Sequence, residues 1–416
     1  MSLEQRAPSV VMIGLGYIGL PTAAVIARTG LRVTGVDVAQ DVVDSVNRGE
    51  IHIEENGLEE LVRGVVGSGN LVAQTEPPRA DIYLIAVPTP FDESHAPDIQ
   101  YVLKAGRAIA PVLSKGAIVI LESTSPVGTT KRLRDLLASE RPDLSFPEAG
   151  GLRHDVQIAY CPERVLPGNI LQELIANDRV IGGLSEDCAT RAKAFYEQFI
   201  EGKCILTDAS SAEMTKLAEN AFRDVNIAFA NELANVAERL DLDVWEVIRL
   251  ANRHPRVNIL NPGPGVGGHC IAVDPWFIVH SAPQDTRLIR TARQVNDGRM
   301  ERVVYRVMAL AEEDDAPIAC FGLAFKANID DMRESPALAI AEQLVEKYGS
   351  RIRICEPYID TLPKWIAAHG ATLVPLEEAL KCEILVVLVD HDVFKSVPGY
   401  AREGKKVIDT RGIWRD

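Results

Sequence analysis

The chain has 416 residues, a length that corresponds to roughly two to three domains. Hydrophobic residues make up 47 % of it and charged residues 25 %, an ordinary globular composition with ample material for a core. The formal net charge of −15 argues against nucleic acid as a partner. An anionic ligand would therefore have to be bound by local basic residues and backbone amides.

Seven cysteines occur, and no two of them form a CxxC pair. Their spacing indicates neither a zinc site nor a disulfide framework, so we expect reduced thiols and no metal. Met1 to Arg6 are not followed by the apolar segment of a secretory signal, and no run is apolar enough to span a bilayer. These features predict a cytoplasmic protein without a membrane partner.

Short apolar runs alternate with helical patterns through the first part of the chain. Strands are predicted at residues 10–13, 31–36, 82–87, 117–121 and 156–160, with the first helix at 21–28. Buried parallel strands have this continuous apolar character, and right-handed connections assemble them into a doubly wound sheet.

The middle of the chain has a different pattern. Residues 210–240 lack Gly and Pro and carry apolar residues at helical spacing, which predicts a long connecting helix, with a further helix at 244–251. Its apolar positions are Leu217, Ala221, Phe222, Val225, Ala228, Phe229, Leu233 and Val236.

The alternation returns near residue 318, where strands are predicted at 318–323, 352–355, 384–389 and 407–408, with a helix at 336–347 between them. We therefore predict an α/β protein with two Rossmann-like doubly wound domains joined by a long helix and a helical core. The predicted boundaries are 1–205, 206–300 and 301–416.

A dinucleotide fingerprint follows the first strand. Gly14, Gly16 and Gly19 form a GxGxxG motif that precedes a helix, and the second strand ends at Asp37. The first glycine permits a tight turn, the second lets the backbone approach a pyrophosphate, and the third lets helix and strand pack closely. Asp37 suits an adenosine ribose and would repel a 2′-phosphate, which favours NAD over NADP.

Two more loops follow predicted strands. One contains Thr89, and the other, residues 123–126, has the hydroxyl groups and the proline of a helix start. A helix N-terminus there would suit a phosphate or a nicotinamide amide. Ordinary helix capping explains each of these loops equally well.

The most informative segment for chemistry is the glycine-rich run from Asn261 to Gly268, which leads to Cys270 and then Asp274. A cysteine behind so many glycines has backbone amides nearby that can hold a sugar or stabilise an oxyanion. A single cysteine is more often a small core residue, but a glycine-rich loop is a poor place for core packing.

The long helix offers a second set of polar residues. Lys216, Asn220 and Arg223 lie at i, i+4 and i+7, so they share one face. A solvated polar stripe is the simpler explanation of the spacing alone. In a desolvated cleft, however, a lysine and an asparagine can hold a developing alkoxide and a water.

Three further groups are candidates. Glu163 and Arg164 directly follow a predicted strand, where a carboxylate could act as a general base. His254 and Arg256 flank a proline, which a surface turn also explains. The third group is Lys326 and Arg333 on the loop after residue 323. From the second α/β domain, these two side chains could bind the phosphates of a ligand.

These residues together resemble the UDP-glucose/GDP-mannose dehydrogenase family over essentially the whole chain. Within the family the match is closest to the bacterial enzymes that act on UDP-N-acetyl-D-mannosamine. The motifs that carry the resemblance are IGLGYIGLPTAA, GEIHI, VPTPF, ESTSPVGTT, AYCPERVLPG, EMTKLAENAFRDVNIAFANEL, NRHPRVNI, PGPGVGGHCIAVDPWF and FGLAFKANIDDMRESPA.

The resemblance implies an NAD-binding domain, a helical dimerisation core and a UDP-binding domain in a homodimer or higher homo-oligomer. It implies a four-electron oxidation of the sugar at C6 through a thioester on Cys270, for surface polysaccharide biosynthesis. The other catalytic residues that it implies are Lys216, Asn220, Asp274, Glu163 and Thr124. It places NAD at Gly14, Gly16, Tyr17, Ile18, Gly19, Asp37, Thr89, Thr130 and Arg333. It places substrate at Arg164, Val165, Lys216, Asn220, Arg223, His254, Arg256, Gly267 and Lys326.

One departure bears on the substrate. UDP-glucose enzymes of the family usually carry Ser before the cysteine and Pro-Lys before the aspartate, whereas this chain has His269 and Ala272-Val273. The resemblance therefore predicts a UDP-N-acetyl-hexosamine substrate. UDP-N-acetylglucosamine dehydrogenases share the Gly-Gly-His-Cys pattern, so the C2 stereochemistry rests on the closer match of the motifs.

Two other functions compete with this prediction. A dehydrogenase that removes one hydride, such as a hydroxy-acid enzyme on a similar fold, would need no nucleophilic cysteine. A non-catalytic NAD-sensing protein would keep the fold and lose the chemistry, but Cys270, Lys216, Asn220 and Asp274 occur together here. The NADH yield per sugar separates the three functions, since it would be two, one or none.

Overall fold

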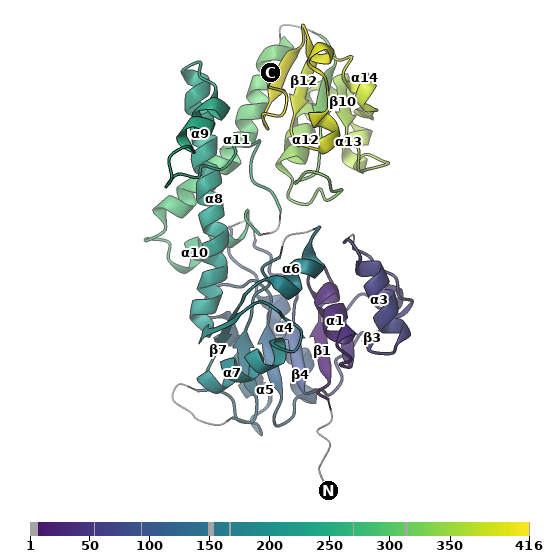
Figure 1. Cartoon of the computed structure of the whole chain (residues 1–416), viewed down its shortest axis with the longest axis vertical. Helices are drawn as coiled ribbons and strands as arrows, with labels where there is room; N and C mark the ends of the chain where they lie inside the picture. The colour runs from purple at the N-terminus through teal and green to yellow at the C-terminus, as the bar shows by residue number, and fades with distance from the viewer. Residues whose placement is uncertain are drawn as a thin grey trace. The chain divides into compact units, whose positions relative to one another are not determined.

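The structure is a computed structural model. It describes residues 7–53, 55–92, 94–148, 154–165, 168–268, 270–312 and 315–415. The chain divides into two compact units (Figure 1). One comprises residues 1–218 with 276–281, and the other comprises residues 219–275 with 282–416.

The first unit is built on an eight-stranded sheet with the order β3-β2-β1-β4-β5-β6-β7-β8. Its strands are β1 Val10–Ile13, β2 Val33–Val36, β3 Leu71–Gln74, β4 Ile82–Ile85, β5 Ile118–Leu121, β6 Gln157–Tyr160, β7 Arg179–Gly183 and β8 Cys204–Asp208. All neighbours pair in parallel except β6 and β7, which pair antiparallel.

Helices cover both faces of this sheet, which confirms the doubly wound prediction. Val10 and Met12 of β1 belong to one hydrophobic core, and Val11 and Ile13 belong to another, because successive strand residues point to opposite faces. The helical segments are α1 Gly19–Arg28, α2 Gln40–Asn47, α3 Leu58–Gly67, α4 Gln100–Ile109, η1 Ala110–Val112, α5 Thr129–Glu140, α6 Ile170–Ala176 and α7 Glu186–Tyr196.

Three strands of this sheet were not predicted from the sequence. β3 and β8 are edge strands with exposed positions, so neither is a continuous apolar run. β7 starts at a buried arginine, Arg179, and ends in two glycines, which hides its strand character.

The helix start predicted at residues 123–126 was wrong. Helix α5 begins later, at Thr129, after Gly128 in a left-handed conformation with φ +95°. The buried Glu213 caps it from α8, because its carboxylate accepts the amides of Gly128 at 2.6 Å and Thr130 at 2.8 Å. The Thr130 hydroxyl donates to the same carboxylate. A side chain more than eighty residues away therefore replaces the local cap.

The long helix is confirmed as α8 Ala209–Arg239, which is 31 residues long. The other central helices are α9 Val244–Ala251, α10 Asp274–Ser281 and α11 Arg287–Glu312. Buried polar side chains join α8 to α11: Arg293 pairs with Asp224 at 2.6 Å, and the Asn231 side-chain amide donates to the Asn296 side-chain oxygen at 2.9 Å. Asn231 also accepts the Gly263 amide at 2.8 Å. The helix pair therefore holds the start of the glycine-rich loop.

The apolar residues of α8 differ in exposure, and Val225 and Leu233 are half-buried. Leu217, Ala221 and Ala228 are buried, whereas Phe222, Phe229 and Val236 are 69 %, 53 % and 49 % exposed. The exposed three recur every seven residues, so they form one stripe along the helix.

A five-stranded parallel sheet forms the core of the C-terminal region, with the order β11-β10-β9-β12-β13. Its strands are β9 Ile318–Phe321, β10 Ile352–Cys355, β11 Thr372–Leu373, β12 Ile384–Val387 and β13 Lys406–Asp409. Its helical segments are α12 Pro336–Tyr348, η2 Gly349–Arg351, α13 Lys364–Ala368, α14 Leu376–Ala379, α15 Asp392–Lys395 and η3 Gly399–Arg402. Hydrophobic cores lie on both faces, as predicted. Among the described helices, none is long and apolar enough to cross a membrane.

Candidate active site

The loop after β1 has the geometry of a dinucleotide-binding turn. Gly14 has φ +92°, and a Cβ there would lie 2.4 Å from the Ala86 carbonyl oxygen. A Cβ on Gly19 would overlap the carbonyl oxygen of Gly14, whereas one on Gly16 would meet nothing within 4 Å. The turn and the helix packing therefore require Gly14 and Gly19. The side of Gly16 is open before the N-terminus of α1, as the close approach of a pyrophosphate to this backbone would require.

Asp37 is fixed at the carboxyl end of β2. Its carboxylate accepts the amides of Leu15 at 2.9 Å and Ala39 at 3.0 Å, and the residue is only half-buried. This carboxylate is held in place and still open to a ribose hydroxyl, so the loop fits NAD. Tyr17 and Ile18 are also half-buried on this loop.

The loops after β4 and β5 are joined to one another. The Thr89 hydroxyl donates to the Thr124 carbonyl at 2.5 Å, and the Ser123 hydroxyl accepts the Val87 amide at 2.9 Å. Thr89 and Thr124 therefore share one edge of the sheet, as their positions after neighbouring strands predict. Thr130 is buried against Glu213, and its contact with NAD stays a prediction.

Cys270 lies at the end of the glycine-rich loop and is the exposed one of the seven cysteines, all of which are thiols. Its carbonyl accepts the Asp274 amide at 2.9 Å, so one helical turn separates the thiol from the first residue of α10. The preceding His269 lies outside the described residues.

The glycine-rich loop packs against the segment from Phe325 to Pro336. A Cβ on Gly267 would lie 2.4 Å from the Glu334 carbonyl oxygen and 2.6 Å from a Pro336 ring carbon. Gly268 has φ +82° and its amide donates to the same Glu334 carbonyl at 3.3 Å. The Cys270 loop and the loop that carries Lys326 are therefore in contact.

The polar face of α8 is buried at two of its three predicted positions. Lys216 and Asn220 are 9 % and 7 % exposed, whereas Arg223 is exposed. Asn220 donates to Asp274, which is 2 % exposed, at 2.5 Å. The solvated-stripe explanation therefore applies to Arg223 alone, and Asn220 is joined to the residue that follows the cysteine turn.

Glu163 belongs to a buried ion pair that sequence reasoning missed. Its carboxylate lies 2.7 Å from the Arg179 guanidinium, with side-chain exposures of 6 % and 1 %, and it accepts the Arg164 amide at 2.7 Å. Arg164 and Val165 are half-buried beside it. Arg179 stands at the start of β7, the strand that was not predicted.

A second buried carboxylate, Glu122, lies next to this pair. It directly follows β5, is 2 % exposed, and accepts the Tyr196 hydroxyl at 2.6 Å. Arg179 lies over the ring of Tyr196, 5.6 Å from its centroid. Burial raises the pKa of Glu122 to about 7, although Arg179 and the Tyr196 hydrogen bond oppose this shift. A glutamate directly after an apolar strand was the available signal for this group.

His254 and Arg256 lie in an exposed turn after α9, where the Arg256 amide donates to His254 Nδ1 at 3.3 Å. The surface-turn explanation describes their positions in the single chain. Lys326 and Arg333 are also exposed, and Arg333 pairs with Asp331 at 2.6 Å.

The second sheet repeats the geometry of the first nucleotide loop. Gly322 has φ +92°, like Gly14, and Glu356 follows β10 as Asp37 follows β2. Glu356 accepts the Leu323 amide at 2.7 Å, but it is only 4 % exposed and faces His391. Burial acts to raise the pKa of Glu356, yet the hydrogen bonds from His391 and the backbone outweigh it and the pKa lies below its usual value. This carboxylate is thus closed to a ribose.

The predicted residues fall into the two units as follows. The first unit holds Gly14, Gly16, Tyr17, Ile18, Gly19, Asp37, Thr89, Thr124, Thr130, Glu163, Arg164, Val165 and Lys216. The second holds Asn220, Arg223, His254, Arg256, Gly267, Cys270, Asp274, Lys326 and Arg333. No cluster of three or more metal-ligating side chains occurs in the described part of the chain.

Three models of one protein family match the chain in succession. They are the NAD binding domain of the UDP-glucose/GDP-mannose dehydrogenase family at residues 8–200, its central domain at 210–298 and its UDP binding domain at 319–416. The chain belongs to the UDP-glucose/GDP-mannose dehydrogenase family. The resemblance seen in the motifs is confirmed, and the protein is an NAD-dependent UDP-sugar dehydrogenase.

Similar proteins cover nearly the whole chain. A UDP-N-acetyl-D-mannosamine dehydrogenase of Salmonella typhi is 57 % identical, over 98 % of this chain and 99 % of its own. An NDP-N-acetyl-D-galactosaminuronic acid dehydrogenase of Ralstonia nicotianae is 55 % identical, over 98 % and 96 %. The solved UDP-D-ManNAc dehydrogenase from Pyrococcus horikoshii is 36 % identical, with a TM-score of 0.87 over 98 % of this chain and 96 % of that one.

The raised pKa of Glu122 predicts a pH-dependent stability. The pKa of Glu122 is about 7 in the folded chain and 4.5 for an ordinary glutamate. The stability of the fold should therefore decrease as pH rises from 4.5 to 7, because the unfolded chain loses this proton first. Glu122→Gln removes this titration. Urea denaturation measures the difference in unfolding free energy between this variant and the unchanged protein. We expect that difference to shift in favour of the variant by up to roughly 3 kcal/mol from pH 5 to pH 8.

The exposed glutamate Glu186 on α7 provides the matched control. Glu186→Gln should follow the pH trend of the unchanged protein. The same trend in Glu122→Gln would show that Glu122 does not titrate in this range.

Proposed function

We propose that the protein oxidises UDP-N-acetyl-D-mannosamine at C6 to UDP-N-acetyl-D-mannosaminuronate. Each sugar consumes two NAD⁺ and one water and releases the carboxylate, two NADH and three protons. The observation that carries this proposal is the identity of 57 % with a UDP-N-acetyl-D-mannosamine dehydrogenase over nearly the full length of both chains. We assign the protein to the cytoplasm, in the synthesis of a surface polysaccharide.

Cys270 is the proposed nucleophile. When bound, NAD⁺ accepts the hydride in each of two oxidation steps. Between these steps the Cys270 sulfur adds to the C6 aldehyde as a thiohemiacetal, and loss of the second hydride leaves a thioester. Water then attacks the thioester carbonyl, which releases the carboxylate and returns the thiol. The exposure of Cys270 on a glycine loop supports this role.

Buried polar groups serve the proton transfers. Lys216 takes up or orients the proton of the C6 hydroxyl, and Asn220 holds Asp274 in place through their hydrogen bond. We assign the hydrolytic water to Asp274, which lies one helical turn after Cys270, since its amide donates to the Cys270 carbonyl at 2.9 Å. Glu163, which accepts the Arg164 amide and pairs with Arg179, is assigned to the surroundings of the reacting carbon.

The remaining residues are assigned to binding. Thr124 lies near the reacting carbon, while Arg164, Val165, Arg223, His254, Arg256 and Gly267 contact the substrate and Lys326 its diphosphate. Gly14, Gly16, Tyr17, Ile18, Gly19, Asp37, Thr89, Thr130 and Arg333 contact NAD. We assign the domain boundaries 1–205, 206–300 and 301–416 to the NAD-binding, central and UDP-binding domains.

A substrate panel tests the function. We expect about two NADH per UDP-N-acetyl-D-mannosamine, and much slower turnover of UDP-N-acetylglucosamine, UDP-N-acetylgalactosamine and UDP-glucose. The galactosamine sugar is included because a relative at 55 % identity bears the name of an N-acetyl-D-galactosaminuronic acid dehydrogenase. Faster turnover of another sugar would overturn the assigned substrate, and one NADH per sugar would overturn the four-electron reaction.

The role of the thiol is tested by Cys270→Ser. A hydroxyl is a far weaker nucleophile than a thiolate, so uronate formation should fall by about a thousandfold or more while NAD binding persists. Cys204→Ser, on the half-buried thiol of β8, is the control and should turn over normally. Normal uronate formation by Cys270→Ser would exclude the thioester route.

A homodimer is proposed from the stripe of Phe222, Phe229 and Val236 on α8, which a second copy of the chain would cover. Phe229→Asp would place a carboxylate in this apolar contact, so it should sediment as a monomer. Tyr400→Asp, at a residue that is 80 % exposed near the second sheet, should remain dimeric. A monomeric unchanged protein, or a dimeric Phe229→Asp variant, would contradict this interface.

A further inference from the structure

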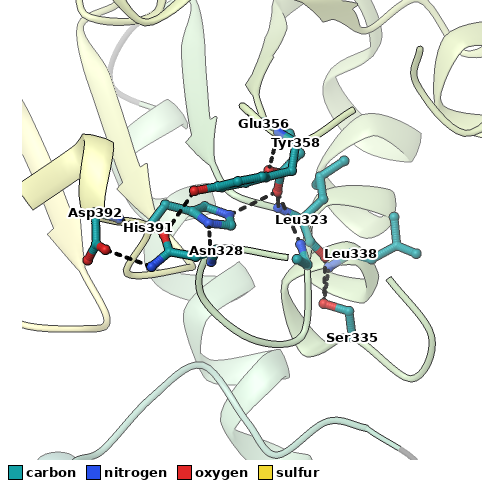
Figure 2. A network of polar contacts seen from close by, with 9 residues as sticks. Leu323, Asn328, Ser335, Leu338, Glu356, Tyr358, His391 and Asp392 are labelled. Atoms are coloured by element: carbon teal, nitrogen blue, oxygen red, sulfur yellow. Dashed lines mark hydrogen bonds and ion pairs between the residues drawn. The ribbon is translucent and has the colours of Figure 1, made fainter. Parts of the chain in front are cut away.

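The buried Glu356 organises the loop that follows β9 (Figure 2). Its Oε2 atom accepts the amides of Leu323 at 2.7 Å and Ala324 at 3.2 Å, and its Oε1 atom accepts the Tyr358 amide at 3.2 Å. The carboxylate thus fixes the beginning of the loop, two residues before Lys326.

His391 lies beside this carboxylate and is fully buried. Its Nδ1 atom accepts the Asn328 amide at 2.9 Å, and its Nε2 atom lies 3.2 Å from Glu356 Oε2 (Figure 2). Because Nδ1 accepts a backbone N–H, the ring proton is on Nε2, which donates to Glu356. One imidazole therefore connects the carboxylate to a point two residues after Lys326.

The backbone of Asn328, two residues after Lys326, has an unusual conformation. Its φ is +63°, in the left-handed region, which few residues other than glycine adopt. Its side chain donates to Asp392 at 2.8 Å and accepts from the Asp392 amide at 3.0 Å and the Tyr358 hydroxyl at 3.1 Å (Figure 2). The segment from Leu323 to Asn328 is thus fixed at both ends.

The far end of the same loop leads to the cysteine. The Ser335 hydroxyl donates to the Leu323 carbonyl at 2.6 Å, and the preceding Glu334 carbonyl accepts the Gly268 amide. A shift of Leu323 would therefore alter both the position of Lys326 and the support of the Cys270 loop.

We propose that His391 is a positioning residue that, with Glu356 and Asn328, holds Lys326 where it binds the diphosphate of the substrate. This inference rests on the proposed function, which assigns the diphosphate to Lys326. His391 itself is buried behind the loop and acts only through it. The polar contacts on either side of Lys326 account for the burial of the Glu356 carboxylate beside the His391 imidazole and for the left-handed conformation of Asn328.

Two substitutions of His391 separate its contacts. In His391→Asn the side-chain oxygen lies near the former Nδ1 atom and can still accept the Asn328 amide. In His391→Gln the side-chain amide lies near the former Nε2 atom, so only the hydrogen bond to Glu356 is kept. Both remove a ring from the same buried position. If the loop contact positions Lys326, His391→Asn should bind UDP within about threefold of the unchanged protein. His391→Gln should bind it about tenfold more weakly, since the part-buried Asn328 amide loses its acceptor.

UDP binding to the full-length protein is measured by isothermal titration calorimetry, and KM and kcat are measured with the preferred sugar. For His391→Gln the KM should rise by about tenfold, whereas kcat should change by less than about threefold. Ile366→Ala is the control for lost stability, since Ile366 is buried in the same domain core. It should lower the melting temperature and leave UDP affinity unchanged.

Lys326→Ala is the reference variant. If it weakens UDP binding and the two His391 variants bind UDP equally well, the positioning role is overturned and the assigned site stands. If Lys326→Ala leaves UDP affinity unchanged, the assigned diphosphate site is wrong, and the inference fails with it. Equal loss of UDP affinity in Ile366→Ala and His391→Gln would also overturn the role, since stability alone would explain it.

Discussion

The proposed chemistry depends on how closely the glycine-rich loop approaches the segment before α12. No side chain fits at Gly267, because a Cβ there would lie 2.4 Å from the Glu334 carbonyl oxygen. The contact fixes the chain three residues before Cys270 against the loop that carries Lys326. In the proposed function, Lys326 on the second loop holds the diphosphate of the nucleotide sugar, and Cys270 on the first loop receives its C6.

Two similar turns in the chain have different uses. Gly14 and Gly322 both have φ +92°, and in each sheet a carboxylate after the next strand accepts an amide from the turn. Asp37 remains half-exposed, which suits the ribose of NAD. Glu356 is buried against His391 and fixes a loop instead. The same turn geometry thus suits a cofactor in one sheet and, in the proposed function, supports the loop that binds substrate in the other.

Local patterns predicted much of the fold, and contacts between distant residues account for what was missed. The glycine fingerprint, the long helix α8 and the central strands follow from spacing within a few residues. The Tyr196–Glu122 bond joins residues 74 apart, and Glu213 caps α5 from 83 residues away, so no local pattern could reveal them. Among the candidate site residues, the turn glycines follow from the sequence pattern, whereas the burial of Asn220 and the partner of Glu163 required the fold.

The central claim is that Cys270 carries the oxidised sugar as a thioester. Its most direct test is mass spectrometry of acid-quenched single turnovers with UDP-N-acetyl-D-mannosamine and excess NAD⁺, using Asp274→Asn to slow hydrolysis. The peptide containing Cys270 should gain the mass of the UDP-uronyl group, and the thiol should resist iodoacetamide until product forms. Release of two NADH per sugar while Cys270 stays unmodified and open to iodoacetamide throughout would contradict it.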